Sequence, residues 1–183
     1  MKKIIIAAFA LAAIAFAPKT SDAQTKMVGG AAMYPTKNIV ENAVNSKDHT
    51  TLVAAVKAAG LVETLESAGP FTVFAPTNEA FDKLPAGTVD NLVKPENKAT
   101  LTKILTYHVV AGKMSSAELW SKVKAGNGKA ELKTVQGGTL TVMAKGKKLY
   151  LVDEKGGKSW ITIADVNQSN GVIHVVNAVL MPN

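Results

Sequence analysis

Apolar residues recur at helical spacing through the first two thirds of the chain. This pattern predicts helices over residues 38–44, 50–59, 61–68, 77–84, 89–93, 95–109 and 116–123. Thr50 or Thr51 is expected to cap the second of these helices and Thr77 the fourth, while Pro95 fits a first helical position. Gly60 is expected to end the second helix, because glycine readily adopts a left-handed backbone.

The C-terminal third carries short runs of β-branched and aromatic residues instead. Five such runs, TLTVMA, KLYLVD, SWITIA, VIHVV and VLM, are separated by turns that contain glycine or asparagine. A further strand is predicted at residues 71–74, and Pro76 is expected to end it. Helices followed by strands in this order predict an α+β domain with a mainly antiparallel sheet.

The N-terminus has the layout of a secretory signal peptide. Lys2 and Lys3 precede an apolar run of 14 residues, and small residues follow at Ser21 and Ala23. A membrane-spanning helix takes about 20 apolar residues, so the run is too short to predict a span. We therefore expect residues 1–23 to be removed and the protein to be exported, to the periplasm or the extracellular space.

The remaining 160 residues (183 minus 23) fit one domain with its own hydrophobic core. We divide them into an N-terminal arm at residues 24–37, which either packs on the domain or stays a leader, and a domain at residues 38–183. The chain has no cysteine. Disulfides, thiolate ligands and a lipid-modified cysteine are therefore excluded, and stability has to come from packing.

The positive charge of the chain consists entirely of lysine. The sequence has 21 basic residues, all lysine, against 14 acidic ones. Arginine is the usual reader of guanine edges and phosphates, so its absence argues against nucleic acid as a partner. The lysines are scattered apart from Lys145, Lys147 and Lys148, which predicts a solvated surface that associates weakly with anionic polysaccharides or lipid headgroups.

Three segments, in order along the chain, resemble the fasciclin domain. They are GPFTVFAPTNEAFDKLP at 69–85, LTKILTYHVVAGKM at 101–114 and SNGVIHVVNAVLMP at 169–182. With the helical entry before them, the resemblance spans residues 38–182. It implies a β-wedge of two mainly antiparallel sheets with helices on one flank. It also implies an extracellular or cell-surface protein that mediates adhesion or matrix contacts without established catalysis.

The histidines have both structural and functional interpretations. Tyr107 and His108 form a pair that the resemblance links with cell adhesion, through direct contact or through the fold. The helix pattern places His108 on an apolar face, which predicts a buried imidazole bonded to the backbone. His174 lies among apolar strand residues and has the same prediction, whereas His49, at a helix start, is expected to cap the helix or lie at the surface.

A candidate contact edge precedes the third fasciclin-like segment. Asp165 and Val166 occupy the place of an Asp-Ile element that belongs to an integrin-contacting motif in some adhesive members of the family. Ala164 replaces the proline and Ile163 the acidic residue that precede it there, so the longer motif is incomplete. The alternative is that Asp165 caps a turn between two strands.

The polar turn at residues 167–170 completes this edge. Its sequence is rich in turn-forming residues, which predicts that it lies at the surface between two strands. Asn167 and Gln168 are therefore candidate contact residues together with Asp165 and Val166.

The sequence contains no catalytic or cofactor-binding motif. The G-x-S-x-G pattern is absent, and residues 126–129 are too short for a phosphate-binding loop. The carboxylate pairs Glu63 with Glu66 and Asp153 with Glu154 are expected to be solvated. The three histidines share no short spacing with one another or with a carboxylate, so no metal or cofactor is predicted.

Two functions from different classes remain. The first is a secreted, non-catalytic binding or adhesion protein whose partner is an extracellular protein or polysaccharide at the envelope, cell surface or matrix. The alternative is a carrier of a lipophilic small molecule, for example a carotenoid-like pigment, in an apolar groove. The Met- and Ala-rich arm between Met27 and Met33 is the part of the sequence that favours the carrier.

Overall fold

The computed structural model describes residues 24–183, so the predicted signal peptide lies outside the described residues. The described chain begins with β1 (Lys26–Val28) and β2 (Ala31–Met33), which pair as a hairpin. Gly29 and Gly30 form its turn with φ angles of 58° and 74°, a conformation that favours glycine. Val28 and Met33 are buried. Residues 26–33 are therefore an arm that packs on the rest of the protein.

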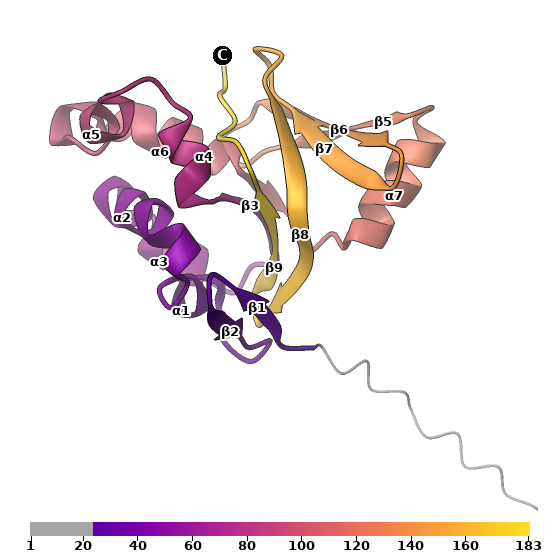
Figure 1. The fold of residues 1–183 in the computed structure, drawn as a ribbon, viewed down its shortest axis with the longest axis horizontal. Helices are drawn as coiled ribbons and strands as arrows, with labels where there is room; N and C mark the ends of the chain where they lie inside the picture. Colours follow the sequence, from indigo (N-terminus) through magenta and orange to yellow (C-terminus); the bar gives the residue numbers. More distant parts are fainter. Residues whose placement is uncertain (1–23) are drawn as a thin grey trace, which may run out of the picture.

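The helices occupy the first two thirds of the chain, as the pattern predicted (Figure 1). They are α1 (Ile39–Ala43), α2 (Thr50–Ala59), α3 (Val62–Glu66), α4 (Asn78–Asp82), α5 (Thr88–Leu92), α6 (Lys98–Tyr107) and α7 (Ser116–Ala125), with 3₁₀ turns η1 (Lys47–His49) and η2 (Pro95–Asn97). Gly60 ends α2 in the left-handed conformation, as expected.

Seven strands form one continuous hydrogen-bonded array. They are β3 (Phe71–Pro76), β4 (Val109–Ala111), β5 (Lys129–Lys133), β6 (Thr139–Lys145), β7 (Lys148–Val152), β8 (Lys158–Gln168) and β9 (Gly171–Val176). Their spatial order is β4-β3-β9-β8-β7-β6-β5. The β3–β9 pair is parallel and the other neighbouring pairs are antiparallel, which confirms the predicted α+β class with a mainly antiparallel sheet.

The long strand β8 joins the two halves of the predicted wedge. Its first residues pair with β7, with Trp160 opposite Tyr150, and its last residues pair with β9, with Gln168 opposite Gly171. The register between β8 and β9 shifts on either side of Ile163. Such bulges bend a strand and increase its twist. The β4-β3-β9 half and the β7-β6-β5 half therefore diverge from β8, as Figure 1 shows.

The strand predictions were wrong at four places. The β1–β2 hairpin was missed because each of its strands has only three residues. The run VLM at residues 179–181 is not a strand, because Leu180 packs in the interior and donates its N–H to the Nε2 atom of His108 instead of to a ladder. Strand β4 was missed because it has only three residues directly after a helix. Strand β5 was missed because its sequence KAELK is mostly charged, although Ala130 and Leu132 point inward.

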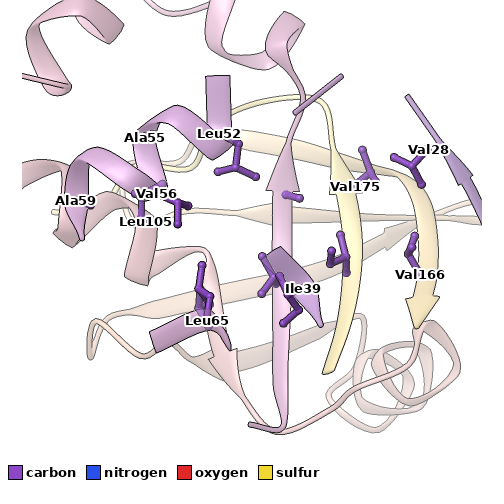
Figure 2. Close-up of a cluster of buried hydrophobic side chains, with 14 of the residues drawn as sticks. Val28, Ile39, Leu52, Ala55, Val56, Ala59, Leu65, Leu105, Val166 and Val175 are labelled. Carbon is purple, nitrogen blue, oxygen red and sulfur yellow. The ribbon is translucent and has the colours of Figure 1, made fainter. Parts of the chain in front are cut away.

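Two hydrophobic clusters hold the elements together. In the first, Ile39, Leu52 and Leu65 extend from α1, α2 and α3 toward β3 and β9 (Figure 2). In the second, Leu119 of α7 packs against the inner face of β5 to β7, which includes Leu140. The helices therefore cover one half of the wedge and α7 covers the inner side of the other.

The cap of α2 comes from another helix. Its N-cap residue makes no side-chain capping bond, and neither does Thr77 at the start of α4. Instead, Asn78 of α4 accepts a hydrogen bond from the Thr51 N–H at 3.0 Å and donates to the Lys47 carbonyl at 2.8 Å. The predicted cap at Thr50 or Thr51 is therefore wrong, and Asn78 replaces it. Thr77 does occupy the N-cap position of α4, as predicted, but its side chain makes no capping bond.

Replacing Asn78 by alanine is expected to lower the free energy of unfolding by about 1 kcal/mol, because the first turn of α2 loses its cap. The neighbouring Thr77→Ala variant is the matched control, with an expected change under about 0.5 kcal/mol. Urea unfolding of the two variants measures both values. Equal losses in the two variants would contradict the assignment of the cap to Asn78.

Candidate functional site

His108 lies in the interior at the end of α6, with 2% of its surface exposed. Its Nδ1 atom donates to the Ile104 carbonyl at 2.9 Å, and its Nε2 atom accepts the Leu180 N–H at 3.0 Å. Because Nε2 is an acceptor, the proton of the neutral ring is on Nδ1. Burial lowers the pKa of His108 to about 4, so the imidazole is neutral near pH 7. This is the buried, backbone-bonded ring that the helix pattern predicted.

Tyr107 is fully buried beside it and is also bonded to the backbone. Its hydroxyl donates to the Thr139 carbonyl at 2.7 Å and accepts the Glu154 N–H at 3.2 Å. Burial raises the pKa of Tyr107 to about 12. Tyr107 and His108 therefore tie α6 to the β6–β7 half and to the C-terminal segment, and neither side chain lies at the surface.

A serine, a histidine and an aspartate meet between α7 and the sheet. The Asp165 carboxylate accepts from the Ser116 N–H at 2.6 Å and from the Ser116 hydroxyl. His174, fully buried in β9, accepts the Asp165 N–H on Nδ1 at 3.3 Å, and its Nε2 donates to the Met114 carbonyl at 2.9 Å. His174 is therefore the satisfied core histidine that the strand pattern predicted.

These three residue types also occur in hydrolytic triads, in which the imidazole removes the proton of the serine hydroxyl. Here the hydroxyl is bonded to the Asp165 carboxylate, and both nitrogens of His174 are bonded to backbone groups. Burial lowers the pKa of His174. The arrangement lacks the serine–histidine contact of a triad and fastens the start of α7 to the sheet.

Asp165 has a different partner from the one predicted. It lies at the irregular part of β8 with a φ of 57°, and its carboxylate bonds to the first turn of α7 instead of a turn between strands. Burial opposes ionisation, but the two hydrogen bonds from Ser116 outweigh it and lower the pKa of Asp165. Asp165 remains partly exposed.

The predicted contact edge is largely internal. Val166 is fully buried and Gln168 is 3% exposed, because Gln168 accepts from the Asn42 amide of α1 and donates to the Val166 carbonyl at 3.1 Å. Asn167 is partly exposed and Ser169 is exposed. The expectation that the whole 167–170 turn lies at the surface is therefore wrong.

Asn170 is the internal anchor of this turn. Its Oδ1 atom accepts the Ile39 N–H at 3.1 Å, and its Nδ2 atom donates to the carbonyls of Leu65 at 2.7 Å and Ser67 at 2.9 Å. One amide thus joins the β8–β9 hairpin to the start of α1 and the end of α3.

Substituting Asn170 by alanine is expected to lower the free energy of unfolding by about 2 kcal/mol, because it leaves buried backbone groups without partners. Ser169→Ala, one residue away and exposed, is expected to change it by less than about 0.5 kcal/mol. Thermal and urea unfolding provide the comparison. An Asn170→Ala variant as stable as Ser169→Ala would show that the turn does not anchor the helices.

His49 is also buried, which contradicts the expected surface position; it does occupy the N-cap position of α2, but its side chain makes no capping bond. Only 1% of its surface is exposed, and its Nδ1 atom lies 2.9 Å from the Ser46 hydroxyl. Burial lowers the pKa of His49, with the Ala75 carbonyl and Asp48 acting in the opposite direction. The carbonyl of Ala75 lies outside hydrogen-bond geometry, so the Nε2 atom has no partner among the described residues.

The two carboxylate pairs differ. Glu63, Glu66 and Glu154 are exposed as expected. Asp153 is 7% exposed, because its carboxylate accepts the N–H groups of the following turn and of Met181. The prediction of a solvated Asp153 is therefore wrong, and the residue holds the β7–β8 turn and the C-terminal segment together.

An apolar crevice of about 40 Å³ lies between the helices and the sheet. It is bordered mainly by aliphatic side chains of α1, α2, α3, β3 and β9, including Ile39, Leu52, Val56, Leu65, Val73 and Ile173. Small-molecule pockets are usually about 300–1,000 Å³. The crevice is therefore too small for a pigment-sized ligand unless the helices move apart.

The outer face of β5 to β8 was not predicted as a site. Lys129, Met143, Tyr150 and Trp160 lie opposite one another on four neighbouring strands. The alternation in each strand could have placed each of them on the outer face. The register that brings them into one row depends on turn geometry, and the sequence specified this geometry less clearly than it specified the alternation within each strand.

Two further features are relevant to the chemistry of residues 24–183. No group of three or more histidine, aspartate or glutamate side chains in this range is arranged to hold a metal ion. Nor does this range contain a helix with the length and apolar character needed to cross a membrane.

The fasciclin domain family model matches residues 47–182. Protein sll1483 of Synechocystis is 45% identical, covering 96% of this chain and 90% of its own length. Immunogenic protein MPB70 of Mycobacterium bovis is 37% identical, and the match covers 96% of this chain and 93% of the length of MPB70. The structure of a FAS1 domain pair from the insect cell adhesion molecule fasciclin I has the same fold, with a TM-score of 0.69 at 18% identity over 79% of this chain and 51% of that one. The chain belongs to the fasciclin domain family.

Proposed function

We propose that this protein is an exported, non-catalytic binding protein that contacts an extracellular protein or polysaccharide at the envelope, cell surface or matrix. The observation that carries this proposal is that the tyrosine and histidine side chains of the fasciclin-like segments are hydrogen-bonded inside the protein. Tyr107, His108 and His174 are buried and bonded to backbone groups. Buried side chains do not recognise an external partner, so recognition is left to the rigid outer surface.

Export is supported by the signal-like layout of residues 1–23, and adhesion by the description of fasciclin I as a cell adhesion molecule. We expect the exported protein to begin at Gln24. Intact-mass measurement of protein recovered from the periplasm or medium of the producing cells tests this. A full-length chain retained in the cytoplasm would contradict export.

Binding is tested with the exported protein immobilised and exposed to envelope and extracellular material from the producing cells. Asn167→Ala and Ser169→Ala together alter the accessible part of the predicted edge, and Lys57→Ala with Lys94→Ala alters the helical flank as a control. Saturable retention of a partner is expected. If one variant stays folded but no longer retains the partner, its substituted residues locate the contact surface. If no fraction binds saturably, the proposal is contradicted.

A carrier of a lipophilic small molecule is the second candidate, and its site would be the apolar crevice beneath α1, α2 and α3, which would have to widen to take the ligand. Met33 of the N-terminal arm borders this crevice. An absorption spectrum and mass spectrometry of an organic extract, both from protein purified from its native host, test this role. A stoichiometric lipophilic molecule would establish the carrier, and a colourless protein with an empty extract would exclude it.

A further inference from the structure

The outer face of β5 to β8 carries a row of large side chains that the helices leave uncovered. Lys129, Met143, Tyr150 and Trp160 stand in register across the four strands. The alternate residues of these strands point to the inner face and are buried in the second cluster. Tyr150 and Trp160 are partly exposed, so they offer aromatic surface to the solvent.

The two aromatic rings form a close pair. Their centroids are 4.8 Å apart with an angle of 39° between the ring planes, and the Tyr150 hydroxyl lies 3.5 Å from the Met143 sulfur. A cross-strand aromatic pair stabilises a sheet, which explains why the two rings face each other. This structural role does not explain the charge around them.

Positive charge surrounds the aromatic pair without matching negative charge. Lys145 and Lys148 are directly opposite each other at the β6–β7 turn, and Lys147 lies in the turn itself. Like charges in such a cross-strand pair are unfavourable. Among the residues of β5 to β8 that share the outer face, Glu131 is the acidic one near this row, and it pairs with Lys129 at 3.7 Å. This face therefore combines partly exposed aromatic surface with positive charge, which attracts an anionic partner.

A groove lies at one end of the row. It is bordered by Lys148, Trp160, Ile161, Thr162 and Asn177, and its volume is about 450 Å³, within the range of small-ligand sites. It opens where β8 leaves β7 and continues beside β9, so the divergence of the wedge creates it. One wall is aromatic, and the others carry an ammonium, a hydroxyl and an amide group.

We propose that this surface, formed by Tyr150, Trp160 and the lysines 145, 147 and 148, binds an acidic polysaccharide. The apolar C–H face of a sugar ring packs on an aromatic ring, and the hydroxyls of the sugar bond to groups such as Thr162 and Asn177. The lysines pair with the carboxylate or sulfate groups of the chain. The inference rests on the proposed binding function and names the partner class and the site.

The chemistry favours an acidic polysaccharide over a neutral polysaccharide and over a lipid surface. A neutral polysaccharide would leave the opposed Lys145–Lys148 pair unexplained. A lipid surface would require protruding apolar side chains, whereas Tyr150 and Trp160 are only partly exposed. The groove is a recess beside an aromatic ring, which suits a pyranose ring better than a flat membrane.

Isothermal titration calorimetry of the exported protein with alginate oligosaccharides tests the proposal. Dextran oligosaccharides control for the acidic groups, polyglutamate for charge alone, and vesicles of phosphatidylglycerol for a lipid surface. The key variant combines Lys145→Ala, Lys147→Ala and Lys148→Ala. Its matched control combines Lys57→Ala, Lys94→Ala and Lys98→Ala, which removes the same charge from exposed positions on the helical flank.

We expect alginate to bind more tightly than dextran or polyglutamate. The sheet-face triple variant should weaken alginate binding by roughly tenfold, and the flank triple variant should leave it nearly unchanged. Trp160→Ala should weaken it by roughly fivefold or more. Because Trp160→Ala removes the aromatic pair, Thr162→Asp serves as a second variant that keeps the pair but repels an acidic ligand.

Several results would overturn the proposal. Equal losses in the two lysine triples, or equal binding of alginate and polyglutamate, would show unspecific attraction of a basic protein to polyanions. Binding unchanged by both Trp160→Ala and Thr162→Asp would exclude the groove, and tighter binding to vesicles than to alginate would assign the surface to lipid. If envelope material binds the sheet-face variant as well as the parent protein, this site assignment fails while the binding function stands.

Discussion

The His108→Ala variant is expected to unfold with a free energy about 2–4 kcal/mol below that of the parent protein. The substitution leaves a cavity at a position that is 2% exposed. It also leaves the Ile104 carbonyl and the Leu180 N–H without their partner. Urea unfolding followed by circular dichroism measures the loss.

Thr100→Ala, on the exposed face of the same helix, is the matched control and should change stability by less than about 0.5 kcal/mol. Any loss of partner binding by His108→Ala should appear together with its loss of stability and be recovered under conditions in which it is fully folded. A variant that melts like the parent protein but no longer binds would identify His108 as a contact residue and contradict its structural role.

Acidification below about pH 6.5 is expected to destabilise the protein steeply. Burial is the leading cause that lowers the pKa of His49, His108 and His174, to about 4 for His108. In the unfolded chain these groups titrate near 6.5. The unfolded state therefore binds protons that the folded state does not, and the stability present above pH 6.5 is lost as the pH falls toward 4.

His108, with a folded-state pKa of about 4, contributes a slope of about 1.4 kcal/mol per pH unit where it is protonated only in the unfolded state. The lowered pKa values of His49 and His174 add to the slope in the same direction. Urea unfolding between pH 7.5 and 4.5 measures the slope. His49→Gln removes one titrating group and should make the dependence of the unfolding free energy on pH less steep. A stability that stays flat from pH 7 to 5 would show that the imidazoles take up protons in the folded state.

The sequence predicted the elements whose burial follows from local periodicity. The single apolar face of α2 and α6 and the fully buried β9 are examples, because spacing along one element decides which side chains turn inward. His108 and His174 were placed correctly for the same reason. Their neighbours in the sequence already defined a buried face.

The errors concern residues whose partners are far away in the sequence. Asn170 looks like a surface turn residue, yet it bonds to Ile39, which is 131 positions earlier. Asn78 caps α2 from 27 positions away, a role that local pattern assigns to threonine. Polarity alone did not distinguish an exposed turn from a polar anchor between two elements.

The candidate binding surface on the outer sheet face was missed for the same kind of reason, because strand pairing brings its residues together. Lys145 and Lys148 are close in sequence, but Tyr150 and Trp160 meet only through the pairing of β7 with β8. Strand β5, which adds Lys129 to the row, was not expected at all. Register therefore creates the candidate surface, and register depends on turns and bulges rather than on composition.

We propose that exposed residues bind an extracellular partner, while the buried polar side chains, together with the hydrophobic clusters, hold the fold. A binding isotherm of residues 24–183 against envelope and extracellular material from the producing cells tests this proposal most directly. The proposal predicts a saturable isotherm that substitutions at exposed residues weaken without lowering the melting temperature. A linear isotherm, or a saturable one that weakens only in variants that also unfold, would contradict it.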